Sequence, residues 1–281
     1  MERKIRIVTR GSNLALKQVD IVGNVFAAAG INYEKIIVRS SGDKDLKTPI
    51  YETKEPGLFV KVLNQVITDG EADLAVHSAK DIPNEIDQAL SIPYYSERGS
   101  INDYFVSKVP LSDFSGTVGG SSVRRKRFLS LMNRSITFVN VRGNIETRLR
   151  KWERGEADSL VMAKVALDRL GIAVQGEVID EDLLPPAPNQ GFIAVVSRKG
   201  SEVEKMLKEL ADPKSLWEAE TERKLMGDLN LGCDLAVSIN ANYESRTVKF
   251  SYASEDRRYD YVFHGYPDKS GLAKLRDVLD E

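Results

Sequence analysis

The sequence has few of the residues that build disulfides and metal sites. Its 281 residues include one cysteine, Cys233, and two histidines, His77 and His264. One cysteine cannot form an internal disulfide, and these three side chains cannot supply the usual zinc ligand sets. A disulfide scaffold and a typical zinc site are therefore excluded. In a reducing compartment, a lone thiol is either an inert buried residue or a chemical handle.

Long apolar runs are also missing. No segment approaches the roughly 18–20 apolar residues that a membrane-spanning helix needs. The chain enters an alternating strand pattern at residues 4–9 with no apolar targeting segment before it, which predicts a cytoplasmic protein without a membrane partner. Hydrophobic residues make up 42% and charged residues 29%, as in ordinary globular proteins. At roughly 100–200 residues per domain, the length predicts two or three domains.

Charge is unevenly distributed, although the formal net charge is only −2. Residues 120–154 contain ten Lys and Arg and only two acids, Glu146 and Glu153. This segment therefore carries +8 and the rest of the chain −10. A basic island in an acidic protein favours a locally held anionic partner over general adhesion to nucleic acid.

Strand and helix patterns alternate along most of the chain. Strands are expected at 4–9, 34–39, 73–77, 103–107, near Val118, and at 136–141, 159–162 and 192–197. Helices are expected at 13–29, 57–69, 121–132, 144–154, 163–170 and 201–210. The last segment adds a helix at 214–227, two or three strands within 235–264 and a helix at 270–280. This order predicts two doubly wound α/β units followed by a small α+β domain, with a polar loop at 40–56 as a lid or binding loop.

Arginines follow three of the expected strands, each beside the start of a helix. In open α/β sheets, ligands bind at the carboxyl ends of the strands, where helix N-termini present free backbone N–H groups. Guanidinium groups there are suited to carboxylates. The sequence therefore predicts an anion site, with solvated surface charge as the alternative. The residues concerned are Arg10, Ser12, Ser121, Ser122, Arg124, Arg125, Arg142 and Arg148.

Two further segments carry reactive side chains. Asp81 follows Lys80 at the end of the third strand, where it is a candidate acid/base, although an aspartate before Pro83 also suits a simple Asx turn. His77 nearby fits a core histidine equally well. Cys233 follows Gly232 and is expected on a loop, with a small buried hydrophobe as the commoner fate of a free cysteine. No second histidine is placed as a general base for a nucleophilic cysteine.

The chain resembles the hydroxymethylbilane synthase (porphobilinogen deaminase) family along nearly its whole length. The matching stretches are IRIVTRGSNLALKQ, GLFVKVL, ADLAVHSAKDIP, GGSSVRRKRFL, VRGNIETRLRKWERGEAD, PAPNQG and ERKLMGDLNLGCDLAVSINA. The resemblance implies two lobes like those of periplasmic binding proteins and a third, cysteine-bearing domain. The expected domains are 1–95 with 190–211, then 96–189, then 212–281.

The resemblance also implies a chemistry. Four porphobilinogen molecules would be joined head to tail with loss of ammonia, on a dipyrromethane cofactor attached to Cys233, and water would release linear hydroxymethylbilane. Asp81 matches the catalytic aspartate. Lys80, Ser121, Arg124, Arg125 and Arg142 match cofactor contacts, and Arg10, Ser12, Arg148 and Arg169 match substrate contacts. The family resemblance favours a monomer with no nucleic-acid partner.

The chain departs from the family pattern at four places. Lys54-Glu55-Pro56-Gly57 replaces a Gly-Gly-Lys-Gly stretch, and Asn189 replaces a glycine in PAPNQG. Around Cys233, Leu231 replaces the first glycine before it, and Asp234-Leu235-Ala236 replaces the common Gln-Val-Pro. Asparagine tolerates positive φ, so the turn at 189 is expected to survive. None of these changes removes a charged group assigned to catalysis, so an active enzyme is expected. The alternatives are a two-lobed anion receptor without catalysis and, less favoured by the acidic balance and few aromatics, a nucleic-acid binder.

Overall fold

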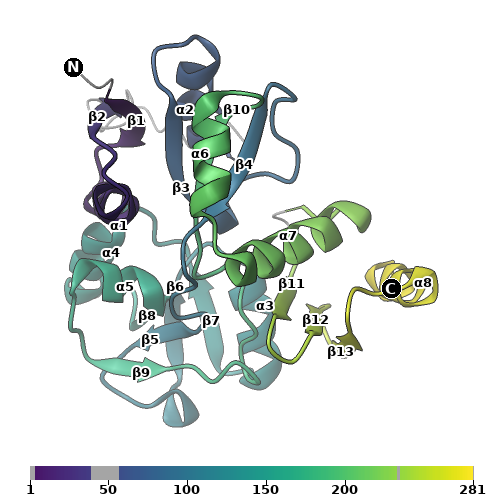
Figure 1. The fold of residues 1–281 in the computed structure, drawn as a ribbon. Coiled ribbons are helices and arrows are strands. Elements are labelled where there is room, and N and C mark those ends of the chain that lie inside the picture. Colours follow the sequence, from purple (N-terminus) through teal and green to yellow (C-terminus); the bar gives the residue numbers. More distant parts are fainter. Residues whose placement is uncertain (1–3, 39–56, 233–234, 281) are drawn as a thin grey trace. The chain divides into compact units, whose positions relative to one another are not determined.

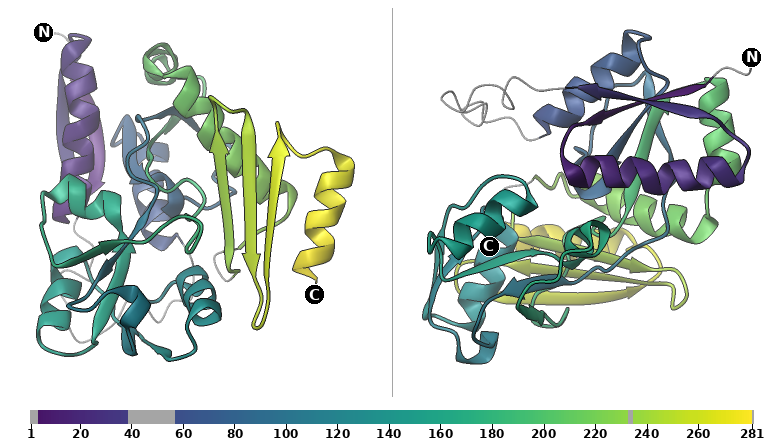
Figure 2. Two further views of the ribbon diagram at one scale, coloured as in Figure 1. Left: turned by 90° about the horizontal axis from the view of Figure 1, so that it is seen from below. Right: turned by 90° about the vertical axis from the view of Figure 1, so that its left-hand side faces the viewer.

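The chain folds into two compact units. A computed structural model describes residues 4–38, 57–232 and 235–280, and its ribbon is drawn in Figures 1 and 2. The first unit comprises Met1–Arg98 and Phe192–Leu216, and the second comprises Gly99–Gly191 and Trp217–Glu281. The expected lid at 40–56 and Cys233 lie outside the described residues.

The first unit is built on a five-stranded sheet with the order β2-β1-β3-β10-β4. Its strands are β1 Ile5–Arg10, β2 Tyr33–Val38, β3 Leu74–Ser78, β4 Leu90–Tyr95 and β10 Ile193–Arg198. Strand β1 pairs in parallel with β2 and β3, whereas β10 runs antiparallel to β3 and β4. Ile193 lies opposite Ser78, so β10 begins at the carboxyl end of β3.

Three helices pack against this sheet: α1 Asn13–Ala28, α2 Leu58–Thr68 and α6 Glu202–Leu210. Helix α1 starts where expected because the Ser12 Oγ accepts the Ala15 N–H at 3.3 Å. Val19, Val22 and Phe26 share the buried face of α1 and join the core of the unit. Burying each such side chain contributes about 1.5–3 kcal/mol, which holds β1 and its helix together.

The second unit repeats this arrangement in a sheet with the order β7-β6-β8-β5-β9. Its strands are β5 Asp103–Val106, β6 Gly116–Gly119, β7 Ile136–Val139, β8 Ser159–Ala163 and β9 Gly176–Val178. Strand β6 is parallel to β7 and β8, and β5 is antiparallel to β8 and β9. Asp103 lies opposite Ala163, so here too the antiparallel strand begins at the carboxyl end of its parallel neighbour.

The helices of this lobe are α3 Val123–Met132, α4 Ile145–Glu153 and α5 Lys164–Leu170. Side-chain caps fix the first two starts: Ser122 accepts the Arg125 N–H, and Asn144 accepts the Thr147 N–H at 2.8 Å. Each cap follows a strand end closely, so the first turns of α3 and α4 lie near the carboxyl edge of the sheet. These turns carry Arg124, Arg125 and Arg148.

The C-terminal part of the second unit is a three-stranded antiparallel sheet. It consists of β11 Val237–Asn242, β12 Thr247–Ala253 and β13 Arg258–His264. Helices α7 Pro213–Asp228 and α8 Lys269–Leu279 flank the sheet in the chain and share its core, which includes Leu225, Phe250 and Leu275. Ala236 and Ala253 instead join the core of the preceding lobe, so the two parts of this unit pack against each other.

The predicted fold class is confirmed: two α/β lobes are followed by a small α+β region. The division into three domains stays a prediction. The sequence pattern does not predict β4 or β9. Pro93 interrupts the pattern of β4 and is tolerated because β4 is an edge strand, while β9 has three exposed residues and no apolar signal. Within the described ranges, no helix is long and apolar enough to span a bilayer.

The β-α-β-α-β order of the first unit predicts a parallel sheet there, but neither sheet is wholly parallel, because β10 and β5 run antiparallel. Both strands come directly after the chain has passed from one unit to the other. Each enters its sheet at the edge where the parallel strands end, so it must run in the opposite direction. The residues at the start of these strands therefore lie at the carboxyl edge of the parallel strands, where ligands bind in open α/β sheets.

Candidate active site

A buried carboxylate organises the arginines of the second lobe. Asp103 is fully buried at the start of β5. Its Oδ2 accepts from Arg124 Nη2 at 2.6 Å, and its Oδ1 accepts from Arg125 Nη2 at 2.7 Å. Both arginines lie in the first turn of α3, where the helix dipole disfavours cations and no acid is present. The Asp103 carboxylate offsets this repulsion and fixes both guanidinium planes.

Arg148 of α4 completes what we call the arginine cluster, namely Arg124, Arg125 and Arg148 around Asp103. Nη2 of Arg148 and Nη1 of Arg125 donate to the same Val161 carbonyl, at 3.0 and 3.2 Å. Burial lowers the pKa of Arg148 to about 10, with Arg125 adding to the decrease and Asp103 opposing it. Burial likewise lowers the pKa of Arg124. Burial therefore disfavours the charged forms of Arg148 and Arg124.

The arginine cluster has more positive than negative charge. Its four side chains carry three formal positive charges and one negative charge. Among the described residues, the buried Nε atoms of Arg124, Arg125 and Arg148 have no hydrogen-bond partner. Buried charges normally find counter-charges, and guanidinium groups bind carboxylates well. An anionic ligand with carboxylates would therefore complete the cluster.

The other predicted residues of this lobe lie outside the arginine cluster. Arg169 of α5 is half-buried, donates from Nη2 to the Gly191 carbonyl at 2.6 Å, and has its pKa lowered to about 10 by burial. Arg142 is exposed, with its Nε bonded to the Asn140 side chain at 3.1 Å. Ser121 is exposed just before α3. Arg169, Arg142 and Ser121 are at least partly exposed, and none of them forms a hydrogen bond to Asp103 among the bonds described for this lobe.

The first lobe holds the other four predicted residues that the structure describes. Asp81 is exposed and ends a short 3₁₀ turn, Ala79–Asp81, directly after β3, with half-buried Lys80 beside it. Arg10 ends β1 and stacks on Phe59 of α2, with 3.8 Å between its Cζ and the ring centroid. Ser12 caps α1, and its hydroxyl proton can still be donated to a ligand.

His77 is a core histidine, the alternative that the sequence left open. It is buried on β3, and its Nε2 lies 3.2 Å from Oδ1 of Asn64 on α2. Burial lowers its pKa to about 4, so the imidazole is neutral at physiological pH. The neutral ring of His77 packs between α2 and β3, and its hydrogen bond to Asn64 joins the two elements.

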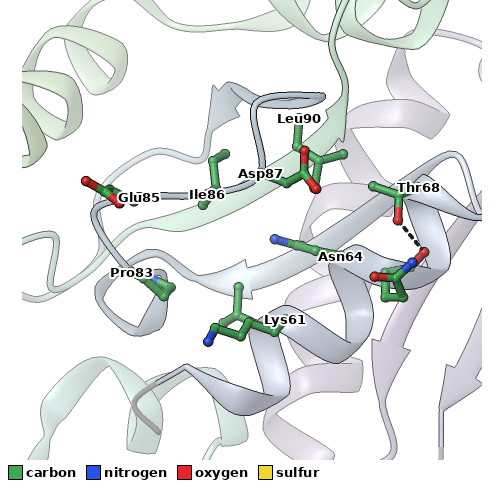
Figure 3. A pocket seen from close by; sticks show the side chains of 10 residues that line it. Lys61, Asn64, Thr68, Pro83, Glu85, Ile86, Asp87 and Leu90 are labelled. Carbon is green, nitrogen blue, oxygen red and sulfur yellow. Dashed lines mark hydrogen bonds between the residues drawn. The ribbon is translucent and has the colours of Figure 1, made fainter.

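The first unit has a cavity of about 290 Å³ between α2 and the segment that precedes β4. Figure 3 shows the side chains that line it. Its polar lining includes Lys61, Asn64, Glu85 and Asp87. Of the predicted site residues that the structure describes, none lines this cavity. Over the described ranges, no cluster of three or more His, Cys, Asp or Glu could hold a metal ion.

Sequence reasoning missed two buried polar residues of the site. Asp103 was seen only as a strand residue, although an acid that opens the apolar run Tyr104-Phe105-Val106 is an unusual feature. Gln190 is fully buried, and its Nε2 donates to the Ile101 carbonyl at 2.6 Å and to Asp103 Oδ1 at 3.2 Å. The signal available in the sequence for Gln190 was its place in the PAPNQG stretch, at the end of a proline-rich connector.

Comparison with solved structures gives weak fold-level likenesses. The methionine-binding protein MetQ matches with a TM-score of 0.46 at 11% identity, covering 78% of this chain and 94% of that chain. The periplasmic VFT2 domain of BvgS from Bordetella pertussis matches with a TM-score of 0.44 at 16% identity, covering 79% and 91% of the two chains.

Comparison with protein families and curated proteins is far more specific. Residues 5–208 match the family model described as porphobilinogen deaminase, dipyromethane cofactor binding domain. A protein named "Probable porphobilinogen deaminase" from Thermoplasma volcanium is 46% identical over 238 residues, covering 84% of this chain and 80% of its own length. One of the same name from Thermoplasma acidophilum is 37% identical, covering 99% and 97%. The chain belongs to the porphobilinogen deaminase family.

Proposed function

We propose that this protein is an active hydroxymethylbilane synthase. It joins four porphobilinogen molecules head to tail, releases one ammonia at each addition, and yields linear hydroxymethylbilane for tetrapyrrole and haem synthesis. The observation that carries the proposal is the arginine cluster, in which two guanidinium groups bind one buried carboxylate and a third, that of Arg148, shares the Val161 carbonyl with Arg125. Porphobilinogen carries an acetate and a propionate side chain, and these carboxylates supply the charge that the cluster lacks.

A dipyrromethane cofactor attached to Cys233 is part of this proposal. The excess positive charge and the unpartnered Nε atoms of the arginine cluster fit a group that bears several carboxylates. When bound, the cofactor supplies the pyrrole carbon that receives the first substrate unit. The residues assigned to hold it are Lys80, Ser121, Arg124, Arg125 and Arg142.

Asp81 is assigned the proton transfer. Its carboxyl group gives a proton to the aminomethyl nitrogen of porphobilinogen, which makes ammonia the leaving group. The resulting carboxylate then stabilises the positive charge that develops on the pyrrole nitrogen of the substrate. Its exposed position after β3 supports this role, because a group buried in the core could not reach a ligand.

Four residues are assigned to the substrate carboxylates. Arg10, Arg148 and Arg169 each keep some exposure while other contacts hold their side chains in place, so less entropy is lost when a ligand binds. The Ser12 hydroxyl can donate one further hydrogen bond. On the family resemblance we expect a cytoplasmic monomer without a membrane partner, and the acidic composition outside one basic segment disfavours a nucleic-acid partner.

The intact mass of the purified protein under denaturing conditions tests the proposal. We expect an excess equal to two linked pyrrole units in the wild type and none in Cys233→Ala. If the wild type is bare, incubation with porphobilinogen should load it and release ammonia. A protein that stays bare and consumes no porphobilinogen contradicts the proposal and favours a two-lobed anion receptor without catalysis.

A further inference from the structure

One buried carboxyl group joins two distant segments of the second unit. Glu222 of α7 is fully buried. Its Oε2 accepts the backbone N–H of Asn189 at 2.5 Å, and its Oε1 accepts the backbone N–H of Ala241, on β11, at 2.8 Å. Both oxygens accept at once, an arrangement that suits the acceptor-only carboxylate. Glu222 thus ties the connector at 185–191 to the C-terminal sheet.

The same connector contacts the arginine cluster. The Pro185 carbonyl accepts a hydrogen bond from Nη1 of Arg124. Gln190 donates to Asp103 Oδ1, the oxygen that also receives Arg125. Residues at both ends of the connector therefore touch the groups that orient the guanidinium planes.

The connector needs such an anchor because its backbone is constrained. Asn189 is nearly fully buried and adopts a φ of 59°, a left-handed conformation that residues other than glycine seldom take. Its N–H would be an unsatisfied buried donor without Glu222. The Glu222 carboxylate both satisfies this donor and holds the turn that aims Gln190 at Asp103.

We propose that Glu222 is a positioning residue for the arginine cluster, acting through Asn189, Gln190 and Asp103. This inference rests on the proposed function for its effect on substrate, but its structural basis is independent of activity. In the sequence, Cys233 lies between α7 and β11, the two elements that the Glu222–Ala241 bond joins. The proposal therefore makes Glu222 the link by which the C-terminal domain influences the affinity for carboxylates.

The test compares Glu222→Gln with a matched control on the same helix. Glu218 lies one turn earlier, is also buried, and its Oε1 accepts the Tyr243 N–H at 2.9 Å. Glu218→Gln thus weakens a comparable bond whose partner lies in the C-terminal region rather than in the connector. A glutamine side chain has one acceptor oxygen, so Glu222→Gln cannot accept both N–H groups.

Hydrogen exchange measured by mass spectrometry on the full chain is the first readout. Glu222→Gln should speed amide exchange about tenfold in residues 185–191 and 237–242, and also in 101–106, where Asp103 lies. Glu218→Gln should leave residues 185–191 and 101–106 unchanged. If the effect of Glu222→Gln stops at its two direct partners and does not reach residues 101–106, the positioning role is wrong.

Steady-state kinetics with porphobilinogen are the second readout. Glu222→Gln should raise KM about tenfold and change kcat less, because the carboxylate-binding groups move while Asp81 does not. Glu222→Asp, which keeps the charge but shortens the reach, should give an intermediate KM. An unchanged KM in Glu222→Gln overturns the proposal. A wild type with no turnover contradicts the proposed function instead and leaves the exchange result to decide the role of Glu222.

Discussion

The two five-stranded lobes share one topology but place different polar groups at equivalent positions. In each sheet an antiparallel strand begins beside the carboxyl end of a parallel one, β10 beside β3 and β5 beside β8. In the second lobe that start is Asp103, which binds two arginines. In the first lobe it is the apolar Ile193, and β3 beside it carries the neutral His77. The shared topology therefore does not determine function, because the side chains at the carboxyl edge of the two sheets differ in chemistry.

The difference is one of buried charge. The first lobe keeps its core edge neutral, because His77 bonds to Asn64 and its pKa is lowered to about 4 by burial. The second lobe buries an excess of cations, which is unfavourable until a counter-charge binds. We infer that the second lobe gives up stability to bind anions, whereas the first lobe carries the proposed acid, Asp81, in the turn after β3. Variants in each lobe distinguish these two roles.

Asp81→Asn should have the largest effect. Asparagine keeps the shape but cannot give a proton, so kcat should fall about 10³-fold while KM changes less than about threefold. Asp87→Asn, another exposed acid of the same unit, is the control and should keep near-normal kcat. The measurement is the initial rate of porphobilinogen consumption. If Asp81→Asn kept a tenth of the wild-type kcat, the first lobe would not hold the essential acid.

Asp103→Asn should have the largest effect on stability. It leaves Arg124 and Arg125 buried without their carboxylate, which should lower the free energy of unfolding by about 3–5 kcal/mol. The control in the first lobe is Asp20→Asn, which breaks an exposed pair with Lys35 and should cost less than about 1 kcal/mol. Urea unfolding of both variants gives the two values. Equal losses would contradict the contrast between the lobes.

Local signals in the sequence predicted most of the elements. Ser12 marked the start of α1, and apolar spacing marked its buried face, because caps and periodicity act over a few residues. β4 was missed because Pro93 interrupts its pattern, and β9 because its three exposed residues carry no apolar signal. The direction of β5 and β10 depends on where the chain crosses between units, which no local pattern records.

The sequence predicted which charged residues form the candidate site but not which of them bind one another. Strand ends and helix starts indicated Arg124, Arg125 and Arg148, because loops at those places are favoured sites. The carboxylate that binds Arg124 and Arg125 was not identified, since Asp103 lies 21 residues from Arg124 in sequence and Gln190 lies 87 residues from Asp103. Such bonds depend on the register of β5 against β8, which is a tertiary feature.

The buried His77 of the first lobe predicts a specific pH dependence. Above pH 6.5, the ordinary pKa of histidine, the imidazole of His77 is neutral in both the folded and the unfolded chain. As pH falls from 6.5 towards 4, only the unfolded chain takes up the proton, so the folded state loses about 3 kcal/mol. His77→Gln should remove this loss, whereas the exposed His264→Gln should keep it. Thermal unfolding between pH 4.5 and 7.5 measures the difference, and parallel curves for wild type and His77→Gln would refute it.

Arg148→Met should weaken substrate binding by the second lobe without lowering the stability of the fold. If Arg148 binds a substrate carboxylate as proposed, the change removes a charge-assisted contact, so kcat/KM should fall about 30-fold, equivalent to about 2 kcal/mol. It also removes a half-buried cation that Arg125 repels, so the Tm of the unliganded protein should not fall. Arg10→Met in the first lobe should lower Tm by about 1–3 °C, because Arg10 stacks on Phe59.

The control for Arg148→Met is Arg150→Met, an exposed change on the same helix that should leave both quantities near normal. Differential scanning calorimetry without ligand gives the Tm values, and porphobilinogen kinetics give kcat/KM. If Arg148→Met lowered Tm as much as Arg10→Met, Arg148 would stabilise the fold as Arg10 does. The two lobes would then not differ in how they use their buried cations, and the excess charge in the second lobe would need another explanation than a bound anion.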